Sequence, residues 1–230
     1  MGRSCRICVA TYYNDDFAPI GTICAKTLRR YTDKHGFDLH VETEITSSRP
    51  PAWNKILLMQ RLLNRDYDYI LWVDADALFI RFAPDIRAEI VEGKDLFLVS
   101  HEIRQAIQPG AWLCLETPNT GVMLLRNSNW TRSFLDKIWQ QTHLINHQFW
   151  ENAAVHELLG YHFLVNPSKR NAPVESMLSH IAWLDLAWNS VPGACESAQP
   201  VIHHYAGYGD RIGPMRRDFA LAERAWADGI

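Results

Sequence analysis

The sequence predicts an α/β fold in which a mostly parallel central sheet is covered by helices on both faces. Apolar runs suited to strands alternate with amphipathic helical stretches through roughly the first third of the 230 residues, in the order strand, helix, strand, helix, strand. The third of these strands, residues 69–73, is continuously apolar and aromatic, as expected of a strand that is buried on both faces. Because consecutive parallel strands need helical crossovers, this order favours helices packed on both sides of a sheet.

The elements are expected in the following order. A strand at 6–11 precedes a helix at 19–34, whose apolar residues recur every three or four positions and which Gly36 should end. Further strands are expected at 37–42, 69–73, 95–100, 121–125, 161–165 and 200–205, and further helices at 53–63, 130–141, 149–159 and 216–227. Residues 102–118 and 166–187 lack a clear period and are predicted to be irregular binding loops.

Composition narrows the class of protein. A chain of 230 residues with 47% hydrophobic residues suits a single domain spanning 1–230. A net charge of −3 without a long basic run argues against a nucleic-acid partner. The five cysteines show no paired zinc spacing, and Cys5 and Cys8 are expected to be small core residues. With no signal peptide and no apolar run near 18 residues, the sequence predicts a cytoplasmic protein without a transmembrane segment; a Golgi luminal domain trimmed from its anchor is the alternative.

The segment Asp74-Ala75-Asp76 follows the buried strand at 69–73 directly. In open α/β sheets, ligands bind outside the carboxyl ends of the strands. Two clustered carboxylates are costly there without a cation, and a hard divalent ion that also binds diphosphate oxygens fits Mg²⁺ or Mn²⁺. The alternative is a pair of solvated aspartates in a turn.

Other polar residues gather at predicted strand ends. His204 could ligate an ion such as Mn²⁺, and Gly207 would let the backbone approach a phosphate closely. Asn119 and Gly121 belong to a turn that either binds a ligand or only reverses the chain. Glu151 lies near a helix start, where the helix dipole alone could explain a carboxylate. The Trp-rich segment 181–189 could be core or a sugar platform.

Six motifs in order resemble glycosyltransferase family 34, the galactosyl-, xylosyl- and mannosyltransferases. The helix motif Trp53-Asn54-Lys55 is followed by the aromatic strand that runs into Asp-Ala-Asp-Ala. Four further matches follow the family's order: Arg30-Tyr31 together with His35-Gly36-Phe37; Asn119-Thr120-Gly121 together with Leu125-Arg126-Asn127-Ser128; Glu151-Asn152-Ala153-Ala154; and His204-Tyr205-Ala206-Gly207. Family 8 is a weaker match, because Asp210 stands where its His-x-x-Gly-x-x-Lys pattern has lysine.

This resemblance implies a GT-A fold with a Rossmann-like nucleotide-binding half, a nucleotide-sugar donor and retention of anomeric configuration. It implies that the metal ligands are Asp74, Asp76 and His204, and that Asp74 also lies near the donor ribose. It further places Thr11, Tyr12 and Tyr13 at the nucleotide base, Asn119 and Gly121 near the transferred sugar, and Glu151 near the reacting carbon. Lys55 or Arg211 could supply a second cation to the diphosphate, although both could equally be surface residues. Asn152 stands where the family has glutamine, which puts a role for that longer amide in doubt.

The expected function is therefore metal-dependent transfer of a hexose or pentose from a UDP- or GDP-sugar to a glycan or other hydroxyl acceptor, as in carbohydrate biosynthesis. Residues 1–100 would form the nucleotide-sugar and metal half, 101–215 the acceptor half and 216–230 a closing helix. A metal-dependent nucleotidyltransferase or phosphatase is an alternative, because such enzymes also place Asp-x-Asp after a strand. A non-catalytic carbohydrate-binding protein is a third possibility and would bind sugar without metal.

Overall fold

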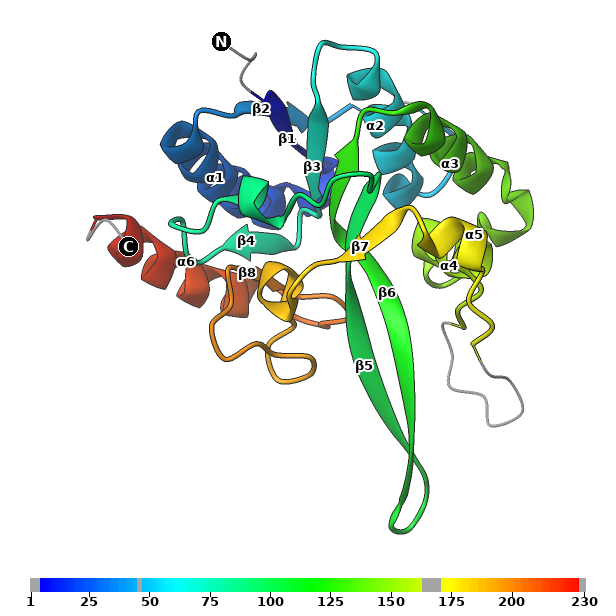
Figure 1. The fold of residues 1–230 in the computed structure, drawn as a ribbon. Coiled ribbons are helices and arrows are strands. Elements are labelled where there is room, and N and C mark those ends of the chain that lie inside the picture. Colours follow the sequence, from blue (N-terminus) through cyan, green and yellow to red (C-terminus); the bar gives the residue numbers. More distant parts are fainter. Residues whose placement is uncertain (1–4, 45–46, 163–170, 228–230) are drawn as a thin grey trace.

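The computed structural model describes residues 5–44, 47–162 and 171–227. Its centre is a six-stranded sheet with the order β2-β1-β3-β6-β5-β7 (Figure 1). Strand β1 (Ile7–Tyr12) pairs in parallel with β2 (Asp38–Glu42) and β3 (Tyr69–Val73). Strand β6 (Ala111–Arg126) runs antiparallel to β3 and to β5 (Leu96–Gln108), whereas β7 (Ile181–Trp183) is parallel to β5. Of these six strands β6 alone runs against the others, so the predicted mostly parallel sheet is confirmed.

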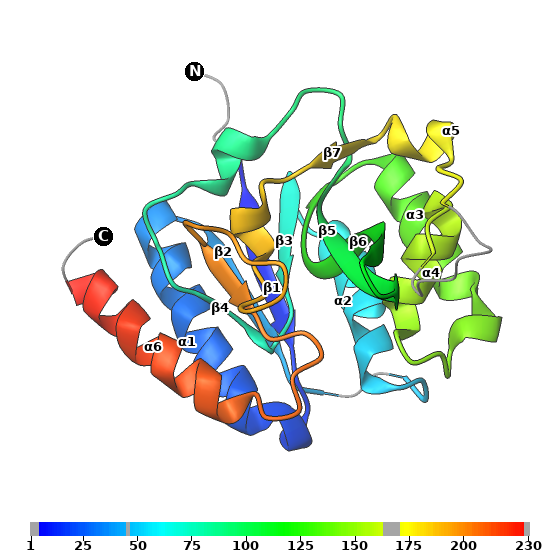
Figure 2. The same ribbon diagram turned by 90° about the horizontal axis from the view of Figure 1, so that it is seen from below.

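Helices cover both faces of the sheet, as predicted (Figure 2). One face packs against α2 (Asn54–Leu63), α3 (Asn129–Gln140) and α4 (Trp150–Leu159). The other face packs against α1 (Ala18–His35) and a two-stranded sheet of β4 (Ala77–Phe79) and β8 (Ile202–His204), with α6 (Ile212–Ala227) beside α1. Alternate residues of each central strand join opposite cores, which explains why the strands read as continuous apolar runs. Helix α5 (Glu175–Leu178) is a single turn.

The first helix shows how local sequence sets an element. Its buried residues recur at helical spacing, among them Ile20, Cys24, Leu28 and Tyr31. The helix ends where Gly36 adopts φ +69°, a left-handed conformation that favours glycine, and donates its N–H to the carbonyl of Thr32. The predicted helix at 19–34 is therefore confirmed with its stop signal.

The prediction of an irregular loop at 102–118 is wrong. Strands β5 and β6 are 13 and 16 residues long and form a hairpin that continues beyond the rest of the sheet (Figure 1). It turns at Pro109-Gly110, where Gly110 has φ +78°. On β5, Glu102, Ile103 and Arg104 are exposed in succession, so this stretch lacks the alternation of buried and exposed residues that a period-two pattern reports. On β6, Leu115 and Thr117 are buried and Cys114 and Glu116 are exposed, a short alternation that the sequence analysis missed.

Other boundaries also differ. The segment 166–187 is not wholly irregular, because α5 and β7 lie within its described part, and residues 166–170 lie outside it. A strand was expected at 161–165. Residues 161 and 162 belong to no strand, and residues 163–165 lie outside the described residues. Strand β4 was not predicted, and α6 begins at Ile212 rather than 216.

Candidate functional site: a carboxylate and histidine cluster at the sheet edge

The short sheet β4–β8 brings His204 to the aspartate pair. The chain leaves β3 at Val73, turns through Asp74 and Asp76, and enters β4, where Ala77 lies opposite His204 on the antiparallel strand β8. Tyr205 N–H donates to the carbonyl of Asp76 at 2.9 Å, which extends this pairing to the turn itself. Side-chain atoms of Asp74, Asp76 and His204 then lie within 4.8 Å of one another. The aspartate pair and His204, about 130 positions apart in the sequence, thus meet at the carboxyl edge of the central sheet.

The two aspartates are held differently. Asp76 lies 3.3 Å from His204 Nε2 through one oxygen, and its other oxygen accepts from Arg211 Nε at 2.9 Å. Burial would raise the pKa of the Asp76 carboxyl, but His204 and Arg211 outweigh it and lower the pKa to about 2. Asp74 Oδ1 accepts from the indole Nε1 of Trp72 at 2.7 Å and lies 2.8 Å from the ammonium of Lys55. Both carboxylates are therefore fixed in place by the protein.

Lys55 lies between Asp74 and Glu151. Its Nζ lies 2.8 Å from Asp74 Oδ1 and 2.7 Å from Glu151 Oε1, and the side chain is only 4% exposed. Burial alone would lower the pKa of Lys55, but Asp74 and Glu151 together raise it, so the ammonium stays charged. The structure thus places this cation between two carboxylates rather than on the surface.

Glu151 projects from the first turn of α4 into the same buried space. Burial raises the pKa of its carboxyl, and Lys55 opposes that rise. Thr120 Oγ1 donates to Oε1 at 3.3 Å, while Oε2 is buried without a hydrogen-bond partner among the described residues. The preceding residue, Trp150, has φ +42°, a left-handed conformation that costs a non-glycine residue energy and is often found at functional sites.

A divalent cation fits this donor set. Asp74, Asp76 and Glu151 supply three carboxylates, against which Lys55 and Arg211 supply two cations, so one negative charge remains uncompensated. Carboxylate oxygens and an imidazole nitrogen are ligands suited to Mn²⁺, and carboxylates also suit Mg²⁺. The side chains of Asp74 and Asp76 are 25% and 13% exposed, so the cluster is open to a ligand.

A second set of hydrogen bonds lies behind His204. Its Nδ1 is 2.9 Å from Asn189 Oδ1, Asn189 Nδ2 donates to Asn119 Oδ1 at 2.9 Å, and Gly121 N–H donates to the same oxygen at 2.8 Å. A Cβ on Gly121 would lie 2.1 Å from Cε1 of His204, so only glycine leaves room for the imidazole ring. Asn119 and Gly121 were both predicted from sequence to belong to the site. Asn119 binds Asn189, which faces His204, and Gly121 lies directly against the His204 ring.

The other predicted residues lie at the same edge. Thr11 and Tyr12 end β1 and are buried, and the Tyr12 hydroxyl accepts from Asn54 at 3.3 Å. Tyr13 is half-buried and its ring lies against Gly21 of α1. Gly207 is exposed with φ +77° in the segment after β8. Arg211 also lines a hollow of about 210 Å³ between this segment and the start of α1.

Sequence reasoning missed Trp72, Asn189 and His101. Trp72 was read only as part of an apolar strand, yet its indole N–H binds Asp74. Asn189 closes the Trp-rich segment, and His101 Nε2 lies 2.7 Å from its backbone carbonyl. A polar residue directly after an apolar run was the only signal for Asn189, and it is a weak one.

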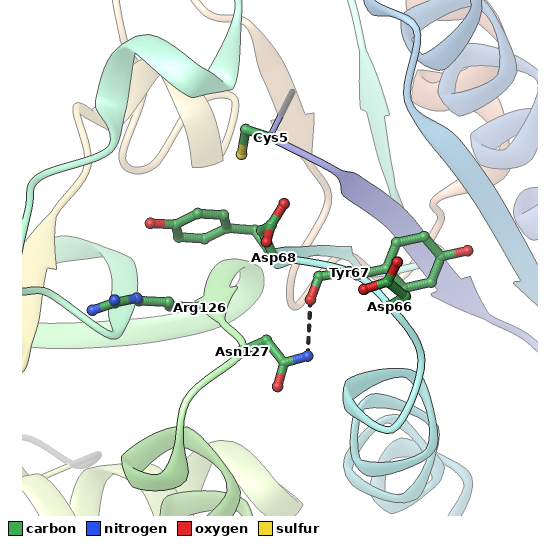
Figure 3. A pocket seen from close by; sticks show the side chains of 7 residues that line it. Cys5, Asp66, Tyr67, Asp68, Arg126 and Asn127 are labelled. Atoms are coloured by element: carbon green, nitrogen blue, oxygen red, sulfur yellow. Dashed lines mark hydrogen bonds between the residues drawn. The ribbon is translucent and has the colours of Figure 1, made fainter. Parts of the chain in front are cut away.

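A larger hollow lies at the other end of the strands. It has a volume of about 620 Å³, and Cys5, Asp66, Tyr67, Asp68, Tyr69, Arg126 and Asn127 line it (Figure 3). Tyr69 begins β3, whereas the aspartate pair follows the end of that strand. None of its lining residues belongs to the predicted site, and size alone gives this hollow no functional role.

The sequence carries a family signature across this site. A family model described as nucleotide-diphospho-sugar transferase matches residues 50–185, which is more than half of the chain. The chain belongs to this family. The matched region contains Lys55, both aspartates and Glu151.

Curated plant proteins match a shorter region. Xyloglucan 6-xylosyltransferase 2 of Arabidopsis thaliana is 29% identical over 110 residues, which is 46% of this chain and 23% of that protein. Probable glycosyltransferase 2 of Oryza sativa subsp. indica is 27% identical over 113 residues, 46% of this chain and 22% of that protein. The match therefore covers under a quarter of these relatives' length. Together with the family model, these relatives confirm the predicted resemblance to glycosyltransferase family 34.

Solved structures show the fold. A glycosyltransferase involved in glycosylation of the major capsid of PBCV-1 superposes with a TM-score of 0.65 at 13% identity, covering 96% of this chain and 99% of that one. The galactosyltransferase LgtC, solved with donor and acceptor sugar analogues, gives 0.60 at 13% identity and covers 94% and 95%. The predicted GT-A fold is confirmed by this likeness. In the described part of the chain, no helix combines the length and apolarity needed to span a membrane.

Proposed function

We propose that this chain is a metal-dependent, retaining glycosyltransferase that moves a hexose or pentose from a UDP- or GDP-sugar to a hydroxyl of a glycan or another acceptor. The observation that carries the proposal is the meeting of Asp74, Asp76 and His204 at the carboxyl edge of the sheet, in a chain of the nucleotide-diphospho-sugar transferase family. The residual negative charge of the cluster is what a divalent cation would neutralise.

Asp74, Asp76 and His204 would hold Mn²⁺ or Mg²⁺. The bound ion would act as a Lewis acid on the leaving nucleoside diphosphate, an effect worth several kcal/mol in the transition state. Arg211, whose side chain is 29% exposed, is the cation of the site best placed to turn from Asp76 towards a phosphate. Lys55 is held by two carboxylates, so its proposed role is to position Asp74 and Glu151 rather than to bind the diphosphate.

The donor would lie along the carboxyl edge. Half-buried Tyr13 is the aromatic ring available to the base, while buried Thr11 and Tyr12 would shape the edge of β1 behind it. The left-handed, exposed Gly207 would let the backbone approach a phosphate. Asn119 and Gly121 would lie near the transferred sugar.

Glu151 would act on the sugar itself. As the sugar–phosphate bond breaks, positive charge builds on the anomeric carbon, and a nearby carboxylate stabilises it. The unpartnered Oε2 of Glu151 supports this role, because a buried carboxylate oxygen is costly without a hydrogen-bond donor or positive charge beside it. In a front-face reaction the departing phosphate accepts the proton of the attacking hydroxyl, and no separate base is needed.

Nucleotide and metal together should stabilise the protein if this proposal is right. Thermal unfolding is measured with UDP, GDP and CMP, each with and without Mn²⁺. A rise in melting temperature that needs both UDP or GDP and Mn²⁺ supports the proposal. Binding of a free sugar without metal would favour a carbohydrate-binding protein. Release of phosphate or transfer of a nucleotidyl group, with no need for a sugar acceptor, would favour the phosphatase or nucleotidyltransferase.

Asp76→Asn tests the metal site directly. The substitution removes one charge with little change of shape, so Mn²⁺-dependent nucleotide binding should be lost in a protein that still unfolds cooperatively, with a melting temperature lowered by the loss of the charge that faces His204 and Arg211. Asp66→Asn is the matched control, because Asp66 lies in the hollow at the opposite strand ends and pairs with exposed Arg6. Unchanged nucleotide and Mn²⁺ affinity in Asp76→Asn would refute the assignment.

A further inference from the structure

Asn189 lies between the predicted metal ligand His204 and the Asn119 turn, and it is fully buried. It belongs to the segment Leu186–Asn189 that precedes β8. Its side-chain oxygen faces His204 Nδ1 at 2.9 Å, and its side-chain nitrogen donates to Asn119 Oδ1 at 2.9 Å. The family motifs do not include this residue, and the sequence patterns placed it only at the end of the Trp-rich segment 181–189.

The backbone fixes which way these amides point. Gly121 N–H donates to the Asn119 side chain at 2.8 Å, and because a backbone N–H can only donate, the Asn119 atom that it meets is the oxygen. Asn189 meets that same oxygen, so it must do so with its NH₂ group. The oxygen of Asn189 is then left facing His204. The orientation follows from the hydrogen-bond chain that begins at the backbone.

The same chain determines the state of the imidazole. An amide oxygen only accepts, so Nδ1 of His204 must carry the hydrogen of the 2.9 Å contact. In a neutral ring this leaves the lone pair on Nε2, the atom that lies 3.3 Å from Asp76 Oδ1 in the carboxylate cluster. A histidine that ligates a metal through one nitrogen commonly donates its other N–H to such an oxygen, which orients the ring.

We propose that Asn189 is a positioning residue that holds His204 in the Nδ1–H tautomer, with Nε2 presented to a divalent cation. This inference rests on the metal site of the proposed function and adds a residue to it.

The segment that carries Asn189 is itself tied to its surroundings. His101 Nε2 lies 2.7 Å from the backbone carbonyl of Asn189 and must donate to it. Burial lowers the pKa of His101 to about 4, so this ring is neutral near pH 7. The next residue, Ser190, donates its N–H to Ile202, and its carbonyl accepts from His204 N–H at 2.8 Å. Asn189 and His204 thus keep a fixed distance through the backbone as well as through their side chains.

The test reads the tautomer without metal. Metal-free protein labelled with ¹⁵N-histidine is examined by long-range ¹H–¹⁵N NMR, and the signal is assigned by its loss in His204→Asn. In the wild-type protein Nδ1 of His204 should carry a proton, whether or not a second proton lies on Nε2 beside Asp76. Asn189→Asp, which keeps an oxygen at that position, should preserve the proton on Nδ1, and Asn189→Leu should lose it. A wild-type ring protonated on Nε2 alone overturns the proposal, and this result does not depend on any Asn189 variant folding.

Mn²⁺ affinity, measured by calorimetry, gives the second readout. It should fall about 10- to 100-fold in Asn189→Leu and be largely retained in Asn189→Asp. Asn127→Leu makes the same change at a residue whose amide binds the carbonyls of Leu63 and Tyr67, away from the site, and should leave Mn²⁺ affinity unchanged. If Asn189→Leu keeps the wild-type tautomer of His204 and the wild-type Mn²⁺ affinity, the inference about Asn189 is overturned while the proposed function stands. A wild-type protein that binds no Mn²⁺ refutes the metal site of the proposed function, while the NMR result still decides the role of Asn189 at His204.

Discussion

Replacing Lys55 by methionine should reveal how strongly the two carboxylates depend on it. The variant keeps the length of the side chain and removes its charge. In the structure the ammonium lies 2.8 Å from Asp74 and 2.7 Å from Glu151, distances at which each contact is worth roughly 6 kcal/mol at an effective dielectric constant near 20. Dehydration of the buried ammonium offsets much of that attraction. Removing one partner of a buried ion pair typically costs about 3–5 kcal/mol, and we expect a loss in this range.

The assay is urea unfolding at pH 7 together with thermal unfolding. A loss of about 3–5 kcal/mol corresponds to a fall of roughly 10 °C in melting temperature for a chain of this size. Lys55→Met/Glu151→Gln should recover a large part of the stability, because the second substitution removes the buried charge that the first leaves unpaired. Lys94→Met is the control, since the half-buried Lys94 donates to the carbonyl of Ser179 away from the site, and it should change the free energy of unfolding by less than about 0.5 kcal/mol.

A loss below about 1 kcal/mol in Lys55→Met would contradict this reasoning. The reasoning would also be contradicted if Lys55→Met/Glu151→Gln had a lower free energy of unfolding than Lys55→Met, by as much as Glu151→Gln costs on its own. Either result would mean that Asp74 and Glu151 are held by other groups and that Lys55 is not their positioning cation.

Three further expectations follow from the same contacts. Glu151→Gln should lower kcat and kcat/KM together with little change in donor Kd, the pattern of an interaction made in the transition state; normal kcat with a lowered melting temperature would remove Glu151 from the reaction. Arg211→Gln frees Asp76, so Mn²⁺ alone should bind more tightly, by up to about fivefold for a partly exposed ion pair, whereas UDP binding in the presence of Mn²⁺ should weaken. Calorimetry that finds no gain in the affinity for Mn²⁺ alone would contradict the role of the Arg211–Asp76 ion pair. Burial lowers the pKa of His156 to about 4, so the unfolded chain takes up a proton before the folded one, and stability should fall as pH drops from about 6.5 to 4; in His156→Gln this fall should be shallower by up to about 1.4 kcal/mol per pH unit, and equal slopes in urea unfolding would refute it.

The sequence identified those parts of the site that short-range patterns record. Asp74 and Asp76 were readable because they follow a continuously apolar strand, and strand ends are where α/β folds bind ligands. His204 was readable mainly through the family motif. Its meeting with the aspartates depends on the pairing of β4 with β8, two strands of three residues each, and strands so short leave almost no periodic signal.

Contacts between distant side chains could not be predicted. Lys55 looked like either a surface lysine or a phosphate ligand, because its partners Asp74 and Glu151 come from other elements. Asn189 acts through the direction of an amide, which only the complete hydrogen-bond chain determines. The hairpin β5–β6 was missed for a different reason: Glu102, Ile103 and Arg104 of β5 are exposed in succession, and sequence periodicity reports burial.

The most direct test of the metal site is the position of the ion itself. Crystals grown with Mn²⁺ and UDP are measured at a wavelength where manganese scatters anomalously. The account predicts a peak about 2.0–2.4 Å from a carboxylate oxygen of Asp74, a carboxylate oxygen of Asp76 and Nε2 of His204, with diphosphate oxygens completing the shell. A manganese peak at other residues, with UDP bound and this cluster empty, would contradict it.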